Sequence, residues 1–200
     1  MFKKFLHFIF SFPWAYNQMQ VFFGANTKKH LVLKHYPFIN NREAVILDLG
    51  GGTGLYRDLW PKNYRYICLD LDAVKLGSLI KDYPDGDVLI ADAGRIPFKD
   101  QSVDAVFCSS LSHHITEDHL DALLTESARV LKASGRLLFL DAVRRDESFL
   151  NRLLWALDKG GHPHTTETLQ GLVQKHFTIE RSDEFSRYYD FILLMATKKA

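Results

Sequence analysis

An acidic residue followed by a glycine-rich turn marks the stretch of this chain best suited to bind a ligand. The sequence there reads Val45-Ile46-Leu47-Asp48-Leu49-Gly50-Gly51-Gly52-Thr53-Gly54. The apolar run before the glycines is typical of a buried parallel strand. Glycine lets the backbone take positive φ and approach a ligand closely, and a helix starting here would direct its free N–H groups at that ligand. The stretch therefore predicts a nucleotide-type ligand site.

Two further acids end expected strands in the same way. Asp70 follows the apolar stretch 64–69, and Asp92 follows the stretch 87–91. Ligands of open parallel sheets bind beyond the carboxyl ends of the strands. We therefore expect Asp48, Asp70 and Asp92 to line one crevice.

The position of Asp48 distinguishes between possible ligands. A dinucleotide fingerprint requires the pattern G-x-G-x-x-G, but Leu55 occupies the place of its third glycine. A carboxylate at Asp48 would repel a pyrophosphate and attract a cation such as the ammonium of an amino acid. An acid at Asp70 can bind both ribose hydroxyls, and one at Asp92 can accept from an adenine amino group. Together these features indicate S-adenosylmethionine.

The same residues resemble the motifs of class I S-adenosylmethionine-dependent methyltransferases. The segment 48–54 resembles their first motif, and Asp70 resembles their ribose-binding acid. The segment 91–98, which reads ADAGRIPF, resembles the part that holds the adenine. Farther along, VDAVF at 103–107 resembles the fourth strand of the class.

The remaining motifs narrow the resemblance. ARVLK at 128–132 with Gly135 resembles the helix and turn before the fifth strand. With Ser112-His113-His114-Ile115, the set is most similar to small-molecule methyltransferases of the ubiquinone and menaquinone biosynthesis type. The resemblance covers residues 44–141 and is specific for the cofactor rather than for the substrate.

The resemblance implies a seven-stranded sheet with an antiparallel last strand. It also implies transfer of the sulfonium methyl in one displacement step, which depends largely on holding donor and acceptor in line. The residues expected at the cofactor are Asp48, Gly50, Gly51, Gly52, Gly54, Asp70, Leu71, Asp92, Ala93 and Ser109.

The loop 109–114 after the fourth expected strand should face the methyl group. Enzymes of the class that methylate exocyclic base or amide nitrogens share an Asn/Asp-Pro-Pro-aromatic tetrad here, whereas this chain has Ser-Ser-Leu-Ser. An oxygen, carbon, sulfur or alkyl nitrogen acceptor is therefore favoured. His113 and His114 are candidate general bases, since histidine titrates near neutral pH. A base is needed only if the acceptor must lose a proton, and the alternative is that each histidine packs under the next helix.

A second pair of histidines lies in the loop Gly160-Gly161-His162-Pro163-His164. His162 and His164 could close over the same acceptor pocket. No carboxylate spacing supports a metal role for the four histidines, so no metal site is predicted.

Strands and helices alternate along the chain in a pattern that predicts a doubly wound, Rossmann-like α/β sheet, mostly parallel, with helices on both faces. Strands are expected at 45–49, 64–69, 87–91, 103–108 and 136–140, the last ending at Asp141. Helices are expected at 14–23, 26–36, 53–60, 72–82, from Thr116 to the Ser134-Gly135 break, at 146–158 and at 166–176. The stretches 177–184 and 188–197 lack a helix-length connector and predict an antiparallel edge hairpin.

Composition and charge indicate one ordinary globular domain. The chain has 200 residues, 46% hydrophobic and 24% charged, with a formal net charge of +1. That balance gives no strong field for nucleic acid. Within the single domain we expect a helical extension or lid at 1–43, a cofactor core at 44–141, and C-terminal helices with the hairpin at 142–200. Cys68 and Cys108 lie in apolar runs and are expected to be buried free thiols, which suits the cytoplasm.

The first twelve residues, MFKKFLHFIFSF, imitate a signal peptide. The apolar part is short, His7 interrupts it and no cleavage site follows, and it is too short to span a bilayer. Its apolar side chains form one stripe at helical spacing. The segment is expected to be a helix packed on the domain, or else a lid or a peripheral membrane contact.

The leading hypothesis is methyl transfer from S-adenosylmethionine to a small apolar or aromatic acceptor. The fifteen Phe and eight Tyr residues would suit such an acceptor, unless they serve only the core. One alternative is a noncatalytic S-adenosylmethionine-binding domain that acts in assembly or regulation. Another is a nicotinamide-dependent oxidoreductase, which Asp48 and Leu55 disfavour.

Overall fold

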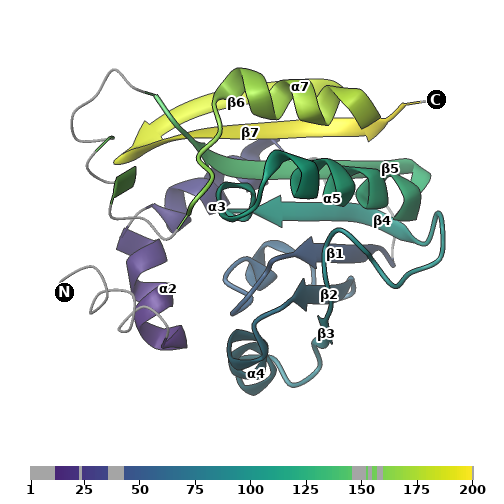
Figure 1. Ribbon diagram of the computed structural model, residues 1–200. Helices are drawn as coiled ribbons and strands as arrows, with labels where there is room; N and C mark the ends of the chain where they lie inside the picture. Colours follow the sequence, from purple (N-terminus) through teal and green to yellow (C-terminus); the bar gives the residue numbers. More distant parts are fainter. Residues whose placement is uncertain are drawn as a thin grey trace.

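A seven-stranded sheet forms the centre of the protein. The computed structural model describes residues 12–22, 24–35, 43–145, 152, 155–156 and 160–199. The strands lie in the order β3-β2-β1-β4-β5-β7-β6 (Figure 1). Their bounds are β1 Val45–Leu49, β2 Arg65–Asp70, β3 Asp87–Ile90, β4 Val103–Ser109, β5 Leu131–Val143, β6 Phe177–Arg187 and β7 Tyr189–Lys198.

Strand direction confirms the predicted fold class. β3, β2, β1, β4 and β5 pair in parallel, whereas β7 pairs antiparallel with both β5 and β6. The register runs from Val143 opposite Asp190 to Arg136 opposite Thr197. The C-terminal stretches therefore form the expected antiparallel hairpin at the sheet edge.

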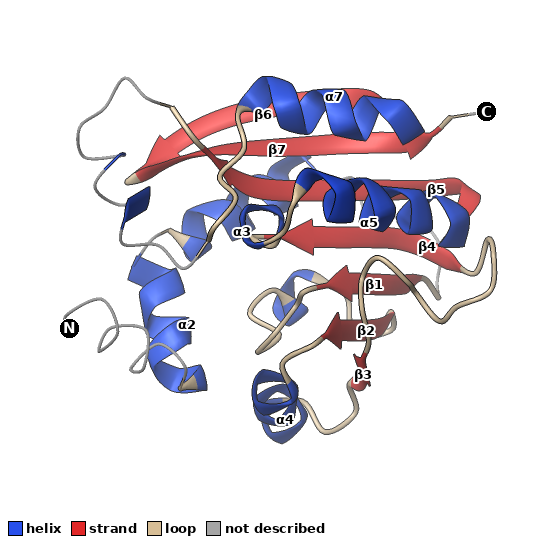
Figure 2. Cartoon of the chain, viewed as in Figure 1, coloured by secondary structure: helices blue, strands red, loops and turns tan. Residues whose placement is uncertain are grey.

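Helices cover both faces of the sheet (Figure 2). Their bounds are α2 Pro13–Phe22, α3 Ala25–His35, α4 Ala73–Asp82, α5 Glu117–Val130 and α7 Thr166–His176, with short 3-10 helices η1 Arg57–Leu59 and η2 Ser112–His114. Neighbouring strand residues point to opposite faces, so Leu47 packs in the cluster with α5 and α7, while Ile46 packs in the one with α3, η1 and α4. This alternation is what a doubly wound sheet requires.

Side-chain caps begin the helices where the sequence indicates. The carboxylate of Asp72 accepts hydrogen bonds from the backbone N–H groups of Val74 and Lys75. Thr116 and Thr165 cap α5 and α7 in the same way. Each cap satisfies an N–H group that has no partner within its helix.

The helix predicted at 53–60 is wrong, because only the short η1 forms there. Gly54 has a φ of +71°, which a right-handed helix does not contain. The turn therefore continues to Gly54, and Pro61 follows too soon for a full helix. The expected helix N-terminus above the glycines is replaced by the backbone of the turn itself.

The predicted boundary between the fifth helix and fifth strand is also wrong. α5 ends at Val130, and β5 begins at once with Leu131 in an extended conformation, opposite Val103. At its other end β5 continues past Asp141 to Val143, because β7 supplies antiparallel partners along that whole length. Asp141 therefore lies inside a strand instead of ending it.

Two sequence predictions fall largely or wholly outside the described residues. Of the helix predicted at 146–158, the structure describes Arg152, Trp155 and Ala156, all helical. The apolar stripe of residues 1–11 is not described. In the described part of the chain, no helix has the length and apolarity needed to cross a membrane.

The carboxyl ends of the parallel strands share one edge of the sheet. In Figure 1 the arrowheads of β1, β2 and β4 point toward the side where α2 and α3 lie. The N-terminal helices are thus placed next to the edge at which open parallel sheets bind ligands.

Two glycines provide a matched test of the turn. At Gly54, φ is +71° and an added Cβ would lie 2.2 Å from Cδ1 of the buried Leu79, whereas at Gly77 in α4 it would meet nothing within 4 Å. We expect Gly54→Ala to lower the free energy of unfolding by about 2–4 kcal/mol through overpacking and backbone strain. Gly77→Ala should raise it by about 0.5–1 kcal/mol. Urea denaturation measures both, and equal stabilities would contradict the geometry of the turn.

Candidate active site

The predicted glycines form a tight turn at the end of β1. Gly50, Gly52 and Gly54 have positive φ values of +67°, +54° and +71°. The N–H of Gly50 donates to the carbonyl of Leu69 at 2.7 Å, which holds the turn against β2. A Cβ at Gly50 would lie 2.9 Å from Cδ1 of Leu111, so glycine is required for the loop after β4 to approach.

Asp48 lies beneath this turn and is only 1% exposed. The hydroxyl of Tyr66 donates to its Oδ2 at 2.5 Å. A Cβ at Gly51 would lie 2.7 Å from the same carboxylate oxygen. Burial raises the pKa of Asp48 to about 7, although the Tyr66 hydrogen bond acts in the opposite direction. Asp48 is therefore a buried carboxylate whose charge changes near neutral pH.

Asp70 ends β2 and braces the glycine turn from the other side. Its Oδ2 accepts from the N–H of Gly52 at 2.9 Å, and its Oδ1 accepts from the N–H of Asp72 at 2.8 Å. Leu71, the next residue, is 70% exposed. A half-buried carboxylate followed by an exposed apolar side chain suits a ribose next to a flat ring.

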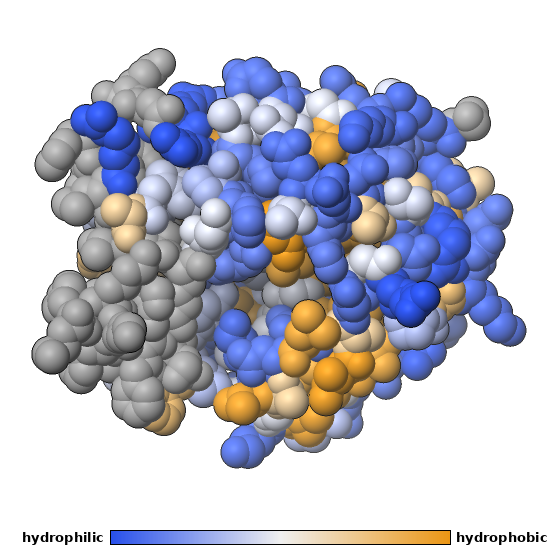
Figure 3. Space-filling model, viewed as in Figure 1, coloured by the Kyte–Doolittle hydropathy of each residue, from blue (hydrophilic) through white to orange (hydrophobic). Residues whose placement is uncertain are grey.

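Apolar surface continues from Leu71 across the neighbouring elements. Figure 3 shows apolar atoms gathered over α4 and β3. The large apolar residues exposed on or beside these elements are Leu71, Val74, Ile80 and Ile90. The patch begins at the carboxyl ends of β2 and β3, which is where the adenine was expected.

Asp92 follows β3, next to the strand that ends in Asp70. Its Oδ1 accepts from the N–H of Gly94 at 2.8 Å and from Nε2 of His119 at 2.9 Å. The His119 hydrogen bond lowers the pKa of Asp92, and the Gly94 bond acts in the same direction. Because β3, β2 and β1 are adjacent, the three predicted acids lie at neighbouring strand ends, with Ala93 beside Asp92.

The loop after β4, residues 109–114, lies next to the glycine turn. The hydroxyl of Ser109 lies beside the buried hydroxyl of Tyr56. Ser110 has a φ of +55°, a left-handed conformation that costs a non-glycine residue roughly 1–2 kcal/mol. Its N–H donates to the carbonyl of Leu140 at 2.9 Å. Strain of this kind is typical of functional loops held by their surroundings.

Asp141 holds that loop in place. Its Oδ2 accepts from the N–H groups of Leu111 at 3.0 Å and Ser112 at 2.7 Å. Its Oδ1 accepts from the N–H of Ala142 at 2.7 Å and from Nδ1 of His113 at 2.6 Å. Burial opposes its charge, but His113 and the Ser112 hydrogen bonds outweigh burial and lower the pKa of Asp141 to about 2. The group is an ionised carboxylate with hydrogen bonds to both oxygens.

The four histidines named from the sequence belong to one neighbourhood. His113 is buried and stacks obliquely on the exposed His114, with 4.1 Å between ring centroids. The N–H of His162 donates to the carbonyl of His113 at 3.0 Å, and Nε2 of His164 to the carbonyl of Ser112 at 3.1 Å. The loop 160–164 therefore packs on the loop after β4. Within the described residues, no three His, Cys, Asp or Glu side chains are grouped to hold a metal ion.

The N-terminal helix α2 covers the glycine turn. The hydroxyl of Thr53 donates to Oδ1 of Asn17 at 2.5 Å. Nζ of Lys75 lies 4.6 Å from the centroid of the Tyr16 ring. These contacts place α2 against the glycine turn and α4.

Asp141 and Lys28 were not identified as site residues from the sequence. Asp141 carries the same signal as the three other acids, since it follows an apolar run. Lys28 lies in the polar run Asn-Thr-Lys-Lys-His, and no local pattern indicates its burial. In the structure Lys28 is only 2% exposed. Burial lowers its pKa to about 8, although Asp141 acts in the opposite direction.

Comparison with known proteins agrees with this geometry. Residues 47–139 match the family model described as "Methyltransferase domain". The chain is 32% identical over 114 residues to phthiotriol/phenolphthiotriol dimycocerosates methyltransferase 1 of Mycobacterium ulcerans, covering 57% of this chain and 40% of that protein. It is 40% identical over 96 residues to malonyl-[acyl-carrier protein] O-methyltransferase of Yersinia pestis, covering 48% of this chain and 35% of that protein. The matches thus span less than half the length of these relatives.

Solved structures share the fold at low sequence identity. A putative methyltransferase of Haloferax volcanii, solved with the Trm112 methyltransferase activator, aligns with a TM-score of 0.78 at 18% identity, covering 96% of both chains. Geranyl diphosphate C-methyltransferase of Streptomyces coelicolor A3(2), solved with S-adenosyl-L-homocysteine, aligns with a TM-score of 0.73 at 11% identity, covering 87% of this chain and 76% of that one. Residues 47–139 therefore match a methyltransferase domain in sequence, and the described chain has the fold of these solved methyltransferases.

Proposed function

We propose that this protein transfers a methyl group from S-adenosylmethionine to a small apolar or aromatic acceptor, at an oxygen, carbon or alkyl nitrogen atom. The observation that supports this acceptor class is a set of aromatic rings beside His113. The ring centroid of His113 lies 5.7 Å from the ring centroid of Trp155. The Trp155 centroid in turn lies 5.3 Å from the ring centroid of Tyr189. Phe191 continues the set, 6.3 Å from Tyr189. Aromatic rings stack favourably on apolar and aromatic ligands.

The cofactor would lie across the ends of β1, β2 and β3. In this proposal Asp70 binds the ribose, Leu71 and Ala93 contact the adenine, and Asp92 accepts from its amino group. Asp48 faces the ammonium group, and the four glycines with Ser109 leave room for the methionine part. When bound, S-adenosylmethionine supplies a methyl group on a positively charged sulfur. The chain would contribute by orienting the acceptor, by excluding water with α2, and by removing a proton where the acceptor carries one.

His113 is the better placed of the two candidate bases. Asp141 accepts from its Nδ1, which fixes the ring orientation and places the proton on that nitrogen. The neutral ring then carries a lone pair on Nε2 that can take a proton. His114 is exposed to solvent, whereas His113 is buried against Asp141. We therefore propose His113 as the general base for a hydroxyl acceptor.

The names of the relatives do not select the acceptor. They include a dimycocerosate methyltransferase, a malonyl-[acyl-carrier protein] O-methyltransferase and a tRNA methyltransferase of Arabidopsis thaliana. The preference for a small molecule, of the kind used by ubiquinone- and menaquinone-type enzymes, rests on the aromatic set and on the net charge of +1, which is weak for nucleic acid.

Three further proposals concern organisation and place in the cell. The chain is one methyltransferase domain, divided at residues 43 and 141 as the sequence predicts. Residues 1–12 extend the lid or contact a membrane surface. Cys68 and Cys108 are buried free thiols, which suits the cytoplasm.

Asp48 and Tyr66 provide a test of the cofactor assignment. Asp48→Ala should weaken binding of S-adenosylhomocysteine, which carries the same ammonium group, by about 1.5–3 kcal/mol for a lost charged hydrogen bond. In the unmodified protein, affinity should fall as pH decreases through 7, because the carboxylate is then protonated. Tyr66→Phe removes a hydrogen bond that favours the ionised form of Asp48, so the pKa of Asp48 should rise. In this variant the loss of cofactor affinity should therefore begin at a higher pH.

Isothermal titration calorimetry between pH 6 and 7.5 measures these affinities. The exposed Asp58, which pairs with Lys29 at 2.9 Å, supplies the control Asp58→Ala, whose affinity should be unchanged. Equal affinity of Asp48→Ala and the unmodified protein would exclude Asp48 from the cofactor site.

His113 is tested by variants that separate proton transfer from packing. His113→Ala and His113→Asn should both lower kcat by roughly 10²–10⁴-fold if the ring is a general base. Asparagine can still donate to Asp141 but cannot take a proton, so a recovery of activity in His113→Asn would indicate a structural role instead. His114→Ala should retain activity within about twofold, since substitution of an exposed side chain usually has a small effect.

The rate of transfer of labelled methyl from S-adenosylmethionine to the small-molecule fraction of one extract compares turnover among the variants, with cofactor affinity measured in parallel. Unchanged turnover in all three variants would remove both histidines from the reaction. Cofactor binding without any labelled small molecule would favour a noncatalytic role.

A further inference from the structure

We infer that Lys28 forms an anion-binding subsite next to the acceptor, and that the acceptor is an aromatic molecule bearing a carboxylate or another ionised oxygen. This inference rests on the proposed function and specifies the substrate class of the same site. It depends on the contacts of one buried ammonium group and on the aromatic rings around it.

Lys28 is a buried cation for which the described part of the chain supplies no carboxylate partner. It projects from α3, and its Nζ lies 3.5 Å from Oε1 of Gln20 and 4.6 Å from the centroid of the Phe191 ring. Among the described residues, no carboxylate lies within ion-pair distance of this Nζ. Lysine is almost never fully buried unless it is paired, and an ammonium group has three hydrogens to donate. One long hydrogen bond and one ring face leave much of that capacity unused.

Several other lysines of the described residues do have a carboxylate partner. Lys29, the next residue of α3, pairs with Asp58 at 2.9 Å. Lys75 pairs with Asp72 at 3.7 Å, and Lys132 pairs with the buried Asp104 at 2.8 Å. The chain therefore supplies a carboxylate to lysines that are far more exposed than Lys28.

Asp141 is the buried acid that attracts Lys28, but it is committed elsewhere. Its two oxygens accept from Leu111, Ser112, Ala142 and His113, as described above. The attraction acts at longer range and does not offset the desolvation of the ammonium group, whose pKa stays below its usual value. A group retained at such a cost to stability is expected at binding sites.

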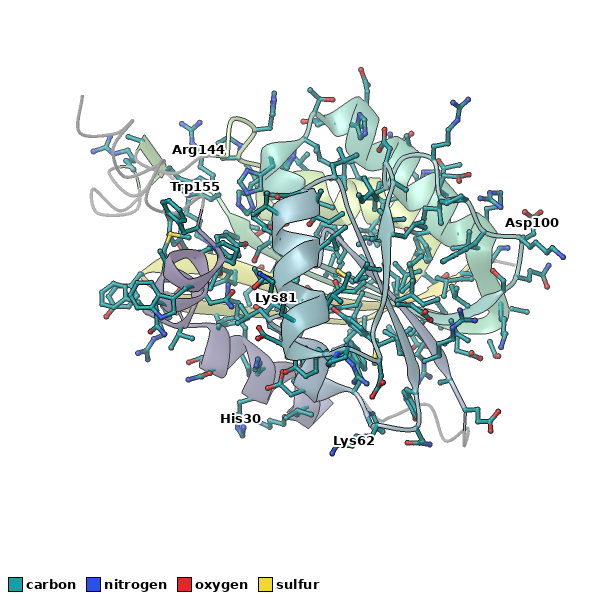
Figure 4. The ribbon with its side chains drawn as sticks, turned by 90° about the horizontal axis from the view of Figure 1, so that it is seen from below. His30, Lys62, Lys81, Asp100, Arg144 and Trp155 are labelled. Atoms are coloured by element: carbon teal, nitrogen blue, oxygen red, sulfur yellow. The ribbon has the colours of Figure 1, made fainter. Side chains whose placement is uncertain are left out.

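The surroundings of Lys28 suit an aromatic anion. Phe191, under the ammonium group, stands opposite Ala142 in the sheet, one residue from Asp141. It belongs to the aromatic set that leads through Tyr189 and Trp155 to His113. Figure 4 shows Trp155 at the end of the molecule beside α2, far from Asp100 at the opposite end of the sheet.

Trp155 gives a second, independent indication. Its Nε1 is buried and has no hydrogen-bond partner among the described residues. Buried donors without acceptors are rare in proteins. Two donors, Lys28 Nζ and Trp155 Nε1, thus have unused hydrogen-bonding capacity among the described residues, beside a cluster of buried aromatic rings. A ligand that combines a ring with anionic oxygens would complement both properties, and an uncharged hydrocarbon would satisfy only the rings.

Matched ligand pairs test the subsite. Binding of benzoate, 4-hydroxybenzoate and 2-naphthoate is compared by calorimetry with binding of the corresponding amides, each with S-adenosylhomocysteine at saturation. We expect at least one carboxylate to bind tenfold or more tightly than its amide. Lys28→Met should abolish that preference, whereas Lys29→Met, on the same helix, should keep it. The inference is overturned if no carboxylate binds more tightly than its amide. It is also overturned if Lys28→Met still binds the carboxylate more tightly than the amide.

Two parallel measurements separate this inference from the proposed function. The melting temperature of Lys28→Met should rise, because methionine replaces a buried charge with an apolar chain of similar length. Its affinity for S-adenosylhomocysteine should be unchanged, and a loss would assign Lys28 to packing of the lid and overturn the subsite. Methyl transfer to uncharged acceptors alone would overturn the subsite and leave the proposed function intact. Failure of the unmodified protein to bind S-adenosylhomocysteine would overturn the proposed function itself.

Discussion

The buried carboxylate of Asp141 is the interaction on which the rest of the site depends. It accepts hydrogen bonds from three backbone N–H groups and one imidazole, all within 3.0 Å. These bonds fix the loop after β4, including the left-handed Ser110 and the short helix that carries His113. Leu111 of that loop then rests on Gly50. One carboxylate thereby connects the loop that carries His113 to the glycine turn, which are the two parts we propose for the acceptor and the cofactor.

Three buried ionisable groups, Asp141, Asp48 and Lys28, differ in how many hydrogen bonds compensate for their burial. Asp141 has hydrogen bonds to both oxygens, so its pKa falls in spite of burial. Among the described residues, the Asp48 carboxylate accepts one side-chain hydrogen bond, from the Tyr66 hydroxyl, so burial dominates and its pKa rises to about 7. Lys28 has a ring face and a long hydrogen bond, and burial lowers its pKa. The fully bonded group serves the fold, whereas the two incompletely bonded groups are those we assign to ligands.

In our proposal the helices before β1 belong to the site, although they precede the glycine turn in sequence. α2 contacts Thr53 and Lys75 at the glycine turn and α4, and α3 carries Lys28, whose ammonium group lies over the Phe191 ring. The same short segment thus reaches both halves of the site. An acceptor bound between Lys28 and His113 would lie beneath a cover built from these two helices.

The sequence by itself determined the sheet and the direction of its strands, because apolar strands and the turns between them are local signals. Glycines and terminal acids are also local signals, and from them the sequence predicted the residues that we propose for the cofactor. Asp48, Asp70 and Asp92 lie at neighbouring strand ends, as that pattern predicts. The helix after Gly54 and the end of the fifth strand were not predictable in this way, since backbone conformation at Gly54 and pairing with β7 decided them. Only the tertiary structure revealed Asp141 as an anchor and Lys28 as a buried cation. Burial and hydrogen bonding of these residues arise from contacts between segments far apart in the chain, and no local pattern encodes such contacts.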